Sequence, residues 1–268
     1  MQTDLKKRNN IHLSGSGKTT LVLAHGYGCD QNMWRRIIPH FERDYRILRF
    51  DHVGSGKSDE RAYDFDKYAS LQGYADDVAE ICAAFCDGNT VFAGHSVSAM
   101  IGVLAASGNP GLFRRMVLVG PSPCYVNDGD YFGGFTPSDI DELIFTLENN
   151  YLGWSRHIAP VIAGGDENAD TARELENSFC RMNPAIAKHF AKVTFTSDNR
   201  GDLMQADLPA LVIQCNPDVI APVEVGKYVA DRLPQGTYTE LKVPGHCPHL
   251  TAPEATAEAV HTFLNEIS

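Results

Sequence analysis

The run Val91–Ala99, V-F-A-G-H-S-V-S-A, limits what this chain can fold into more than any other segment. An apolar stretch typical of a buried strand leads directly into Ser96, and a stretch rich in Ala, Gly and Ser follows it. A strand that turns into a helix at one serine needs small neighbours, here Gly94 and Ser98, and it projects the hydroxyl above the sheet. Ser98 replaces the second glycine of the common G-x-S-x-G pattern, so we expect slight crowding. Taken alone, the motif also fits an ordinary tight turn.

Two further segments supply the partners that a serine nucleophile needs. Asp218 follows the apolar run Ala210–Cys215, and His246 follows the run Tyr238–Val243, so each lies just beyond an expected strand. In such a site a histidine takes the serine proton, and a carboxylate holds the tautomer of that histidine. The chain order serine, aspartate, histidine is the order of α/β-hydrolases and differs from that of two protease families with the same chemistry. We therefore predict a catalytic triad of Ser96, Asp218 and His246.

An oxyanion hole is the fourth part that this chemistry requires. The expected strand Leu21–Ala24 is followed by H-G-Y-G, about 70 residues before the serine, as the α/β-hydrolase plan requires. We expect the backbone N–H groups of Tyr27 and Val97 to be the two donors. Gly26 and Gly28 allow the loop to fold tightly over the site.

Short apolar runs alternate with helix-length amphipathic segments along most of the chain. This alternation predicts an α/β fold, specifically an α/β-hydrolase fold with a mostly parallel sheet flanked by helices on both faces. Strands are expected at Leu21–Ala24, Tyr45–Phe50, Thr90–Ala93, Met116–Val119, Ala210–Cys215 and Tyr238–Val243. Helices are expected at Asn32–Phe41, Leu71–Phe85, Val97–Ser107, Pro222–Arg232 and Pro253–Glu266.

The alternation stops between Tyr125 and Ser197. This stretch holds about four helical patterns with no clear strand between them. We interpret it as an inserted helical lid over residues 125–196, with the hydrolase core formed by residues 1–124 and 197–268. Its aromatic residues have an ordinary explanation, which is the packing of the lid helices against one another.

Several runs resemble those of the RsbQ-like α/β-hydrolases, a family that includes a bacterial regulator of the sigma-B stress pathway and the plant strigolactone and karrikin receptors. The resemblance extends from about Asn10 to the end of the chain. Two features depart from the expected patterns, namely Ser98 and the Pro217 that precedes Asp218. The runs are H-G-Y-G-C-D-Q, F-D-H-V-G-S-G-K-S-D, G-H-S-V, G-P-S-P-C-Y, G-G-F, V-I-A-P-x-x-V-G-K-Y and G-H-C-P-H.

The resemblance implies the same triad and an apolar pocket above the serine. It implies a serine hydrolase that acts on a small apolar ester or lactone and signals in stress regulation, with a PAS-domain phosphatase as partner. The alternative is a general small-ester carboxylesterase with a metabolic role. The candidate pocket residues are Phe135, Trp154, Phe195 and Tyr27.

Composition excludes several other classes of function. The net charge of −11 argues against nucleic acid or an anionic membrane as a partner. No run of 18 apolar residues occurs and the N-terminus lacks the apolar segment of a secretory signal, so we expect a cytoplasmic protein. The seven cysteines include no C-x-x-C pair, which favours reduced thiols over disulfides or a zinc site.

Two sets of apparent ligand motifs are set aside. The runs S-G-S-G-K-T-T and G-S-G-K-S would be phosphate-binding loops only with a glycine five residues before the G-K pair, where the chain has His12 and Asp51. The pairs His246 with His249 and His25 with His52 lack supporting carboxylate or cysteine spacing. We therefore expect no cofactor and no metal.

Overall fold

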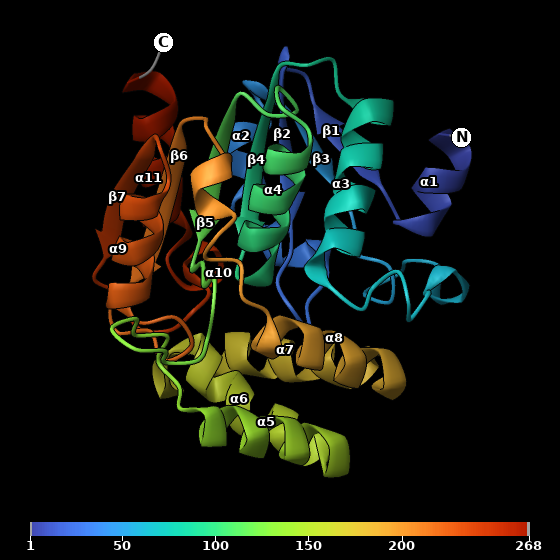
Figure 1. The fold of residues 1–268 in the computed structure, drawn as a ribbon. Helices are drawn as coiled ribbons and strands as arrows, with labels where there is room; N and C mark the ends of the chain where they lie inside the picture. The colour runs from blue at the N-terminus through green and yellow to red at the C-terminus, as the bar shows by residue number, and fades with distance from the viewer. Residues whose placement is uncertain (1, 267–268) are drawn as a thin grey trace.

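Seven strands form one sheet at the centre of the computed structural model, which describes residues 2–266 (Figure 1). The strand order is β1-β3-β2-β4-β5-β6-β7, in which β1 is antiparallel to β3 and every other neighbouring pair is parallel. The prediction of a mostly parallel α/β sheet is confirmed. The strands are β1 His12–Gly15, β2 Thr19–Ala24, β3 Tyr45–Arg49, β4 Thr90–His95, β5 Arg115–Val119, β6 Ala210–Cys215 and β7 Gly236–Leu241.

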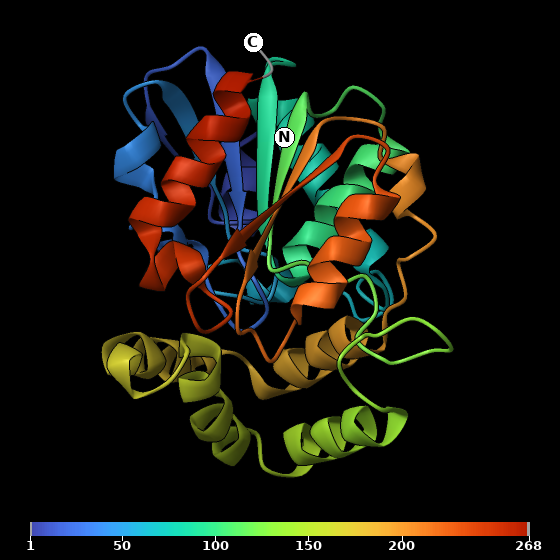
Figure 2. The ribbon, with the colours of Figure 1, turned by 90° about the vertical axis from the view of Figure 1, so that its left-hand side faces the viewer.

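Helices cover both faces of the sheet, because parallel strands need crossover connections that return over a face. Helices α3, α4 and α9 lie on one side, and α2 and α11 lie on the other (Figure 2). The strands β4 and β6 are buried at every residue, which explains why both are nearly continuous apolar runs in the sequence. These helices are α2 Ile38–Phe41, α3 Leu71–Phe85, α4 Val97–Gly108, α9 Val223–Arg232 and α11 Pro253–Glu266, and the remaining short ones are α1 Gln2–Arg8 and α10 Pro248–Thr251.

Four consecutive helices lie across one end of the sheet (Figures 1 and 2). Local caps explain where three of them begin. Thr136 and Asp139 form a reciprocal capping box at the start of α5, and the side chains of Asn150 and Asn183 accept hydrogen bonds at the starts of α6 and α8. The four helices, which we call the cap helices, are α5 Pro137–Asn149, α6 Tyr151–Ala163, α7 Ala169–Arg181 and α8 Pro184–Thr196.

The main differences between prediction and structure are in the segment after β2 and at the two edge strands of the sheet. The prediction of a single helix at Asn32–Phe41 is wrong, because a 3₁₀ turn and the short α2 take its place. Pro39 lies in the first turn of α2 and lacks the N–H that a continuous helix needs. The last strand, β7, begins two residues earlier than expected. The edge strand β1 was not predicted, because its residues are mostly exposed and form no apolar run.

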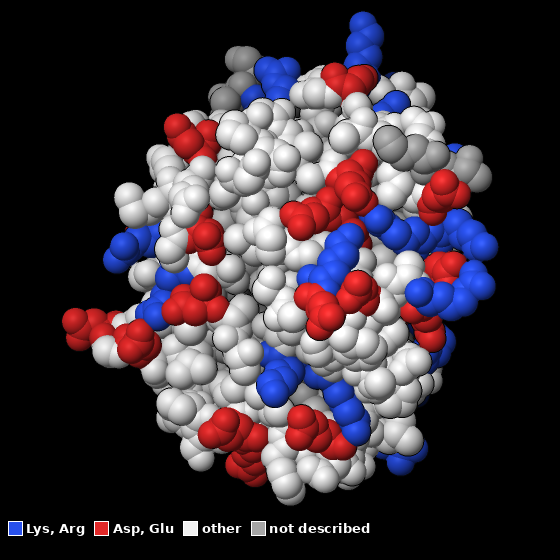
Figure 3. All heavy atoms as spheres, turned by 45° about the vertical axis from the view of Figure 1, so that its right-hand side comes forward, with Lys and Arg blue, Asp and Glu red and all other residues white. Residues whose placement is uncertain are grey.

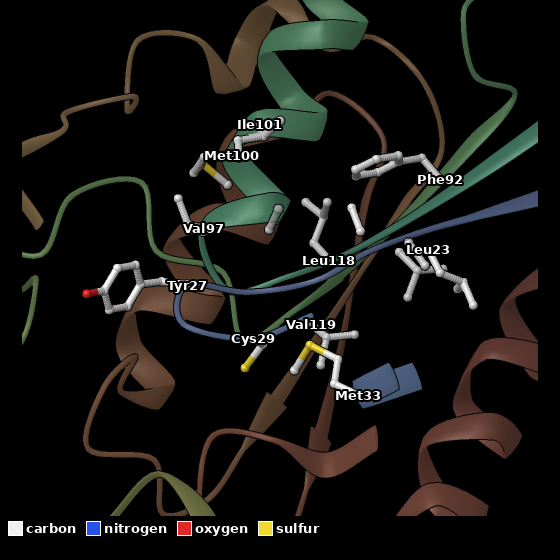
Figure 4. Packing of buried hydrophobic residues seen from close by; sticks show 14 of the residues in the cluster. Leu23, Tyr27, Cys29, Met33, Phe92, Val97, Met100, Ile101, Leu118 and Val119 are labelled. Carbon is white, nitrogen blue, oxygen red and sulfur yellow. The ribbon is translucent and has the colours of Figure 1, made fainter. Parts of the chain in front are cut away.

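The buried core reaches the end of the sheet that faces the cap helices. Residues of β2, β4, β5 and α4, including Leu23, Phe92 and Leu118, belong to one cluster that also contains Tyr27 and Val97 (Figure 4). The backbone segments expected to form the oxyanion hole are therefore anchored to a close-packed interior.

The surface carries mixed charge. On the face shown in Figure 3, acidic and basic side chains are interspersed over a largely uncharged surface. Within the part of the chain that the structure describes, no helix is both long enough and apolar enough to span a bilayer.

Candidate active site

Ser96 occupies the turn between β4 and α4. Its backbone has φ 56° and ψ −124°, a conformation that costs a non-glycine residue about 1–3 kcal/mol. Two main-chain hydrogen bonds hold it there: Ser96 N–H donates to Val119 O at 2.8 Å, and Ala99 N–H donates to Ser96 O at 2.9 Å. The strained turn directs the hydroxyl away from the helix and toward His246.

The three residues of the predicted triad meet in space. His246 Nε2 lies 2.8 Å from Ser96 Oγ, and His246 Nδ1 lies 2.7 Å from Asp218 Oδ2. All three residues are buried. Because Asp218 accepts at Nδ1, the hydrogen-bond pattern assigns the ring proton to Nδ1 and leaves the Nε2 lone pair facing the serine hydroxyl. This arrangement can deprotonate Ser96.

Asp218 is fixed by four hydrogen bonds. Besides the bond to His246, its Oδ1 accepts from Ile220 N–H at 2.8 Å and Ala221 N–H at 3.1 Å, and its Oδ2 accepts from Gln214 Nε2 at 3.1 Å. Gln214 is fully buried at the fifth position of β6, and it was not among the predicted site residues. A lone amide side chain within an apolar strand is the signal that could have identified it.

The loop that carries His246 is tied to three other parts of the molecule. His246 N–H donates to Ile162 O in α6 at 2.8 Å, and His246 O accepts from His95 Nε2 at 2.9 Å. Gly245 N–H donates to Pro217 O, next to the acid, at 2.9 Å. The main chain of the histidine is thus held by a cap helix, the strand before the serine and the acid loop.

The H-G-Y-G loop packs directly on the serine turn. A methyl group added at Gly26 would lie 2.5 Å from His95 Nδ1 and 3.3 Å from Ser96 Cβ, so only glycine permits this approach. Among the residues that the structure describes, none accepts a hydrogen bond from the Tyr27 or Val97 N–H. Neither predicted donor is therefore paired within the described part of the chain. The Tyr27 side chain instead donates to Ala187 O in α8 at 2.9 Å.

A small cavity of about 40 Å³ opens above Ser96, between the sheet and the cap helices. Trp154, Phe195 and Tyr27 lie in its wall, together with Phe179 and Tyr125, which were not among the candidates. Phe135 does not reach the cavity. Its N–H donates to Tyr125 O at 3.1 Å, and its half-buried ring packs against the Tyr125 ring with 6.4 Å between centroids.

The Tyr125 phenol and the Cys247 thiol in the cavity wall are both neutral. Burial raises the pKa of Tyr125 to about 12, so its phenol stays protonated at neutral pH. Burial also raises the pKa of the Cys247 thiol well above its usual range, which excludes it as a competing nucleophile. Thr194 Oγ1 is buried and has no hydrogen-bond partner among the described residues. An apolar ligand with few polar atoms suits this wall.

One cluster near the triad has the composition of a metal site. Ligand atoms of His95, Cys247 and His249 lie within 4.8 Å of one another, and all three residues are buried. However, His95 Nε2–H donates to His246 O, and Gly26 covers its Nδ1. His95 therefore offers a metal ion no accessible lone pair, and the cluster as arranged does not fit one.

Comparison with known proteins agrees with this geometry. Residues 21–259 match the sequence model of the alpha/beta hydrolase family. The chain belongs to the alpha/beta hydrolase family. It is 39% identical to a karrikin insensitive 2 receptor of Petunia hybrida, with 93% of each chain covered, and 37% identical to a strigolactone esterase of Arabidopsis thaliana, with 98% of each covered. A solved hydrolase from Oleispira antarctica superposes with a TM-score of 0.95 at 41% identity, covering 98% of this chain and 97% of that one.

Proposed function

We propose that this alpha/beta hydrolase is a serine hydrolase of the RsbQ-like kind that cleaves a small apolar ester or lactone and serves as a ligand sensor. The observation that carries the proposal is the hydrogen-bonded chain from Ser96 through His246 to Asp218. Ser96, at one end of this chain, lines a small apolar cavity beneath the cap helices. Relatives named as a receptor and an esterase support both halves of the proposal.

In this proposal the reaction has two steps, acylation of Ser96 and hydrolysis of the acyl-enzyme. His246 Nε2 takes the Ser96 proton as Oγ attacks the carbonyl carbon, and the N–H groups of Tyr27 and Val97 stabilise the oxyanion. The carbon–oxygen bond to the leaving group then breaks, and His246 returns the proton to that oxygen. Water, activated by His246, hydrolyses the acyl-enzyme and restores Ser96.

The size of the cavity favours a sensor over a fast metabolic esterase. A volume of 40 Å³ is well below the roughly 300–1,000 Å³ of a typical small-molecule pocket. A larger ligand must therefore move side chains of the cavity wall, and several of these, including Trp154, Phe179 and Phe195, belong to the cap helices. Its binding would then change how the cap helices pack on the core. A fast esterase gains nothing from such coupling, whereas a sensor requires it. A PAS-domain phosphatase is the partner proposed from the family resemblance, and a gene for one beside the gene of this chain would support it.

The test compares pre-steady-state and steady-state hydrolysis of p-nitrophenyl acetate and butyrate by the wild type and Ser96→Ala. We expect a burst of about one equivalent of p-nitrophenol followed by slow turnover. We also expect kcat to fall by about 10⁴-fold or more in the variant, because triad residues act as a unit. Sustained fast turnover would favour the general carboxylesterase. Equal turnover by both proteins would overturn the serine mechanism.

A further inference from the structure

Three buried polar side chains behind the serine turn form a network that the mechanism above does not use. His25 directly follows β2, His52 lies beyond β3, and Ser98 is the second residue of α4. Each is at most 1% exposed. The Ser98 hydroxyl donates to His25 O, and His52 Nε2 lies 2.7 Å from Ser98 Oγ. The Ser98 hydroxyl, which we expected only to crowd the turn, therefore forms two hydrogen bonds in the buried core.

The network fixes the tautomer of His25. His52 N–H donates to His25 Nε2 at 3.0 Å, so Nε2 must carry a lone pair. In the neutral ring the proton then resides on Nδ1, which lies 2.8 Å from Gly26 O and donates to it. Burial lowers the pKa of both histidines, which keeps both rings neutral at physiological pH. His25 is thus held by hydrogen bonds at its O, Nε2 and Nδ1 atoms, and the bond from Nδ1 reaches Gly26 O.

That last bond helps to hold the peptide between Gly26 and Tyr27, which carries one of the two proposed oxyanion donors. Gly26 O also accepts from Cys29 N–H at 3.3 Å, so two donors hold this carbonyl. In a planar trans peptide the N–H points opposite to the C=O. The Tyr27 N–H, which belongs to the same peptide unit, is therefore directed away from the His25 ring. Rotation of this peptide would remove one of the two proposed oxyanion donors.

We propose that Ser98 and His52 are positioning residues that act through His25 to hold the Gly26–Tyr27 peptide with its N–H toward the developing oxyanion. The inference rests on the proposed serine hydrolase function and assigns a role to the residue that replaces the second elbow glycine. Loss of the Ser98 hydroxyl leaves His25 O and His52 Nε2 without their partner, and the loop is then free to relax.

The experiment uses Ser98→Ala, with Ser107→Ala as the matched control. Ser107 is also on α4 and also donates to a backbone carbonyl, Val103 O at 2.8 Å, but it lies in the last turn of the helix. The ligands are an alkyl trifluoromethyl ketone and the corresponding methyl ketone. With the first, a bond forms between Ser96 Oγ and the carbonyl carbon, the C=O π pair becomes the oxyanion, and the serine proton moves to His246. The methyl ketone reports binding without the adduct.

We expect Ser98→Ala to lower kcat and the affinity for the trifluoromethyl ketone by the same factor, about tenfold. The KM and the affinity for the methyl ketone should stay unchanged, and Ser107→Ala should match the wild type in every measurement. His25→Asn, which keeps a donor close to the position of Nδ1, should retain more activity than His25→Leu. This second pair keeps the test decisive if Ser98→Ala folds poorly.

Two results would overturn the proposal. One is a folded Ser98→Ala protein with wild-type kcat and wild-type affinity for the trifluoromethyl ketone. The other is an equal loss of affinity for both ketones, which would indicate a distorted cavity rather than a misplaced oxyanion donor. Failure of the underlying function is distinguishable, because the wild type would then form no adduct and Ser96→Ala would turn over esters as fast as the wild type.

Discussion

At the scale of single residues, the acid of the triad depends on a side chain that never contacts the ligand. Gln214 Nε2 donates both to Asp218 Oδ2 and to Ala221 O, so it joins the carboxylate to the loop that carries it. This bond reaches the same oxygen that holds His246. Without it, only the two backbone N–H groups at Oδ1 and the imidazole itself hold the carboxylate.

We expect Gln214→Met to lower kcat about tenfold with little change in KM, because a buried hydrogen bond to a charged group is worth about 1.5–3 kcal/mol. Methionine keeps the volume of the side chain and so avoids a cavity. The measurement is steady-state hydrolysis of p-nitrophenyl acetate beside a thermal melt. A variant with wild-type kcat would show that the two backbone N–H groups position Asp218 without help.

Some residues of the site can be predicted from the sequence, and others cannot. Ser96, Asp218 and His246 could each be located because each follows a strand-like run, and parallel strands bring their carboxyl ends to one edge of the sheet. Phe135 could not be placed, because hydrophobicity does not say which side of a loop faces a cavity. The bond of Gln214 to Asp218 depends on the path of a loop, which no pattern in the sequence specifies.

At the scale of elements, the end of α6 controls the position of the catalytic histidine. Gly164 ends this helix with φ 89°, and a methyl group added there would lie 2.4 Å from Pro244 O, two residues before His246. Ile162 O, two residues before Gly164, accepts a hydrogen bond from the His246 N–H. A cap helix and the catalytic loop are therefore joined by a hydrogen bond and by close packing. The four helical patterns of this region could be seen in the sequence, but this junction depends on the packing of distant segments.

We expect Gly164→Ala to lower kcat by about tenfold more than Gly165→Ala does. Both substitutions place a side chain at positive φ, which costs about 1–2 kcal/mol, but a methyl group at Gly165 meets nothing within 4 Å. Only the first variant pushes on the histidine loop. Thermal melts of both variants measure the loss of stability that the positive φ causes in each. Steady-state ester hydrolysis measures the difference in kcat between them. Equal activities would mean that the loop absorbs the displacement.

At the scale of the whole molecule, four buried histidines make stability depend on pH. Burial lowers the pKa of His25, His52 and His95, and lowers that of His249 to about 3, with His246 and Arg35 adding repulsion at His249. These rings stay neutral in the folded protein, whereas in the unfolded chain they titrate near pH 6.5. Below that pH the unfolded state binds more protons. The stability is therefore complete above about pH 7 and is lost as the pH falls.

We expect the urea midpoint to fall markedly between pH 7.5 and pH 5.5, since each such histidine contributes up to about 1.4 kcal/mol per pH unit below its unfolded pKa. Most carboxylates titrate below this window, so the histidines dominate the slope. His249→Gln removes one of the four protons and should make the slope shallower by about a quarter, whatever it does to the stability at pH 7.5. Two results would contradict this prediction: a urea midpoint that does not change across this pH range, or a pH slope that is the same in His249→Gln as in the wild type. Either result would show that the buried rings become protonated in the folded protein.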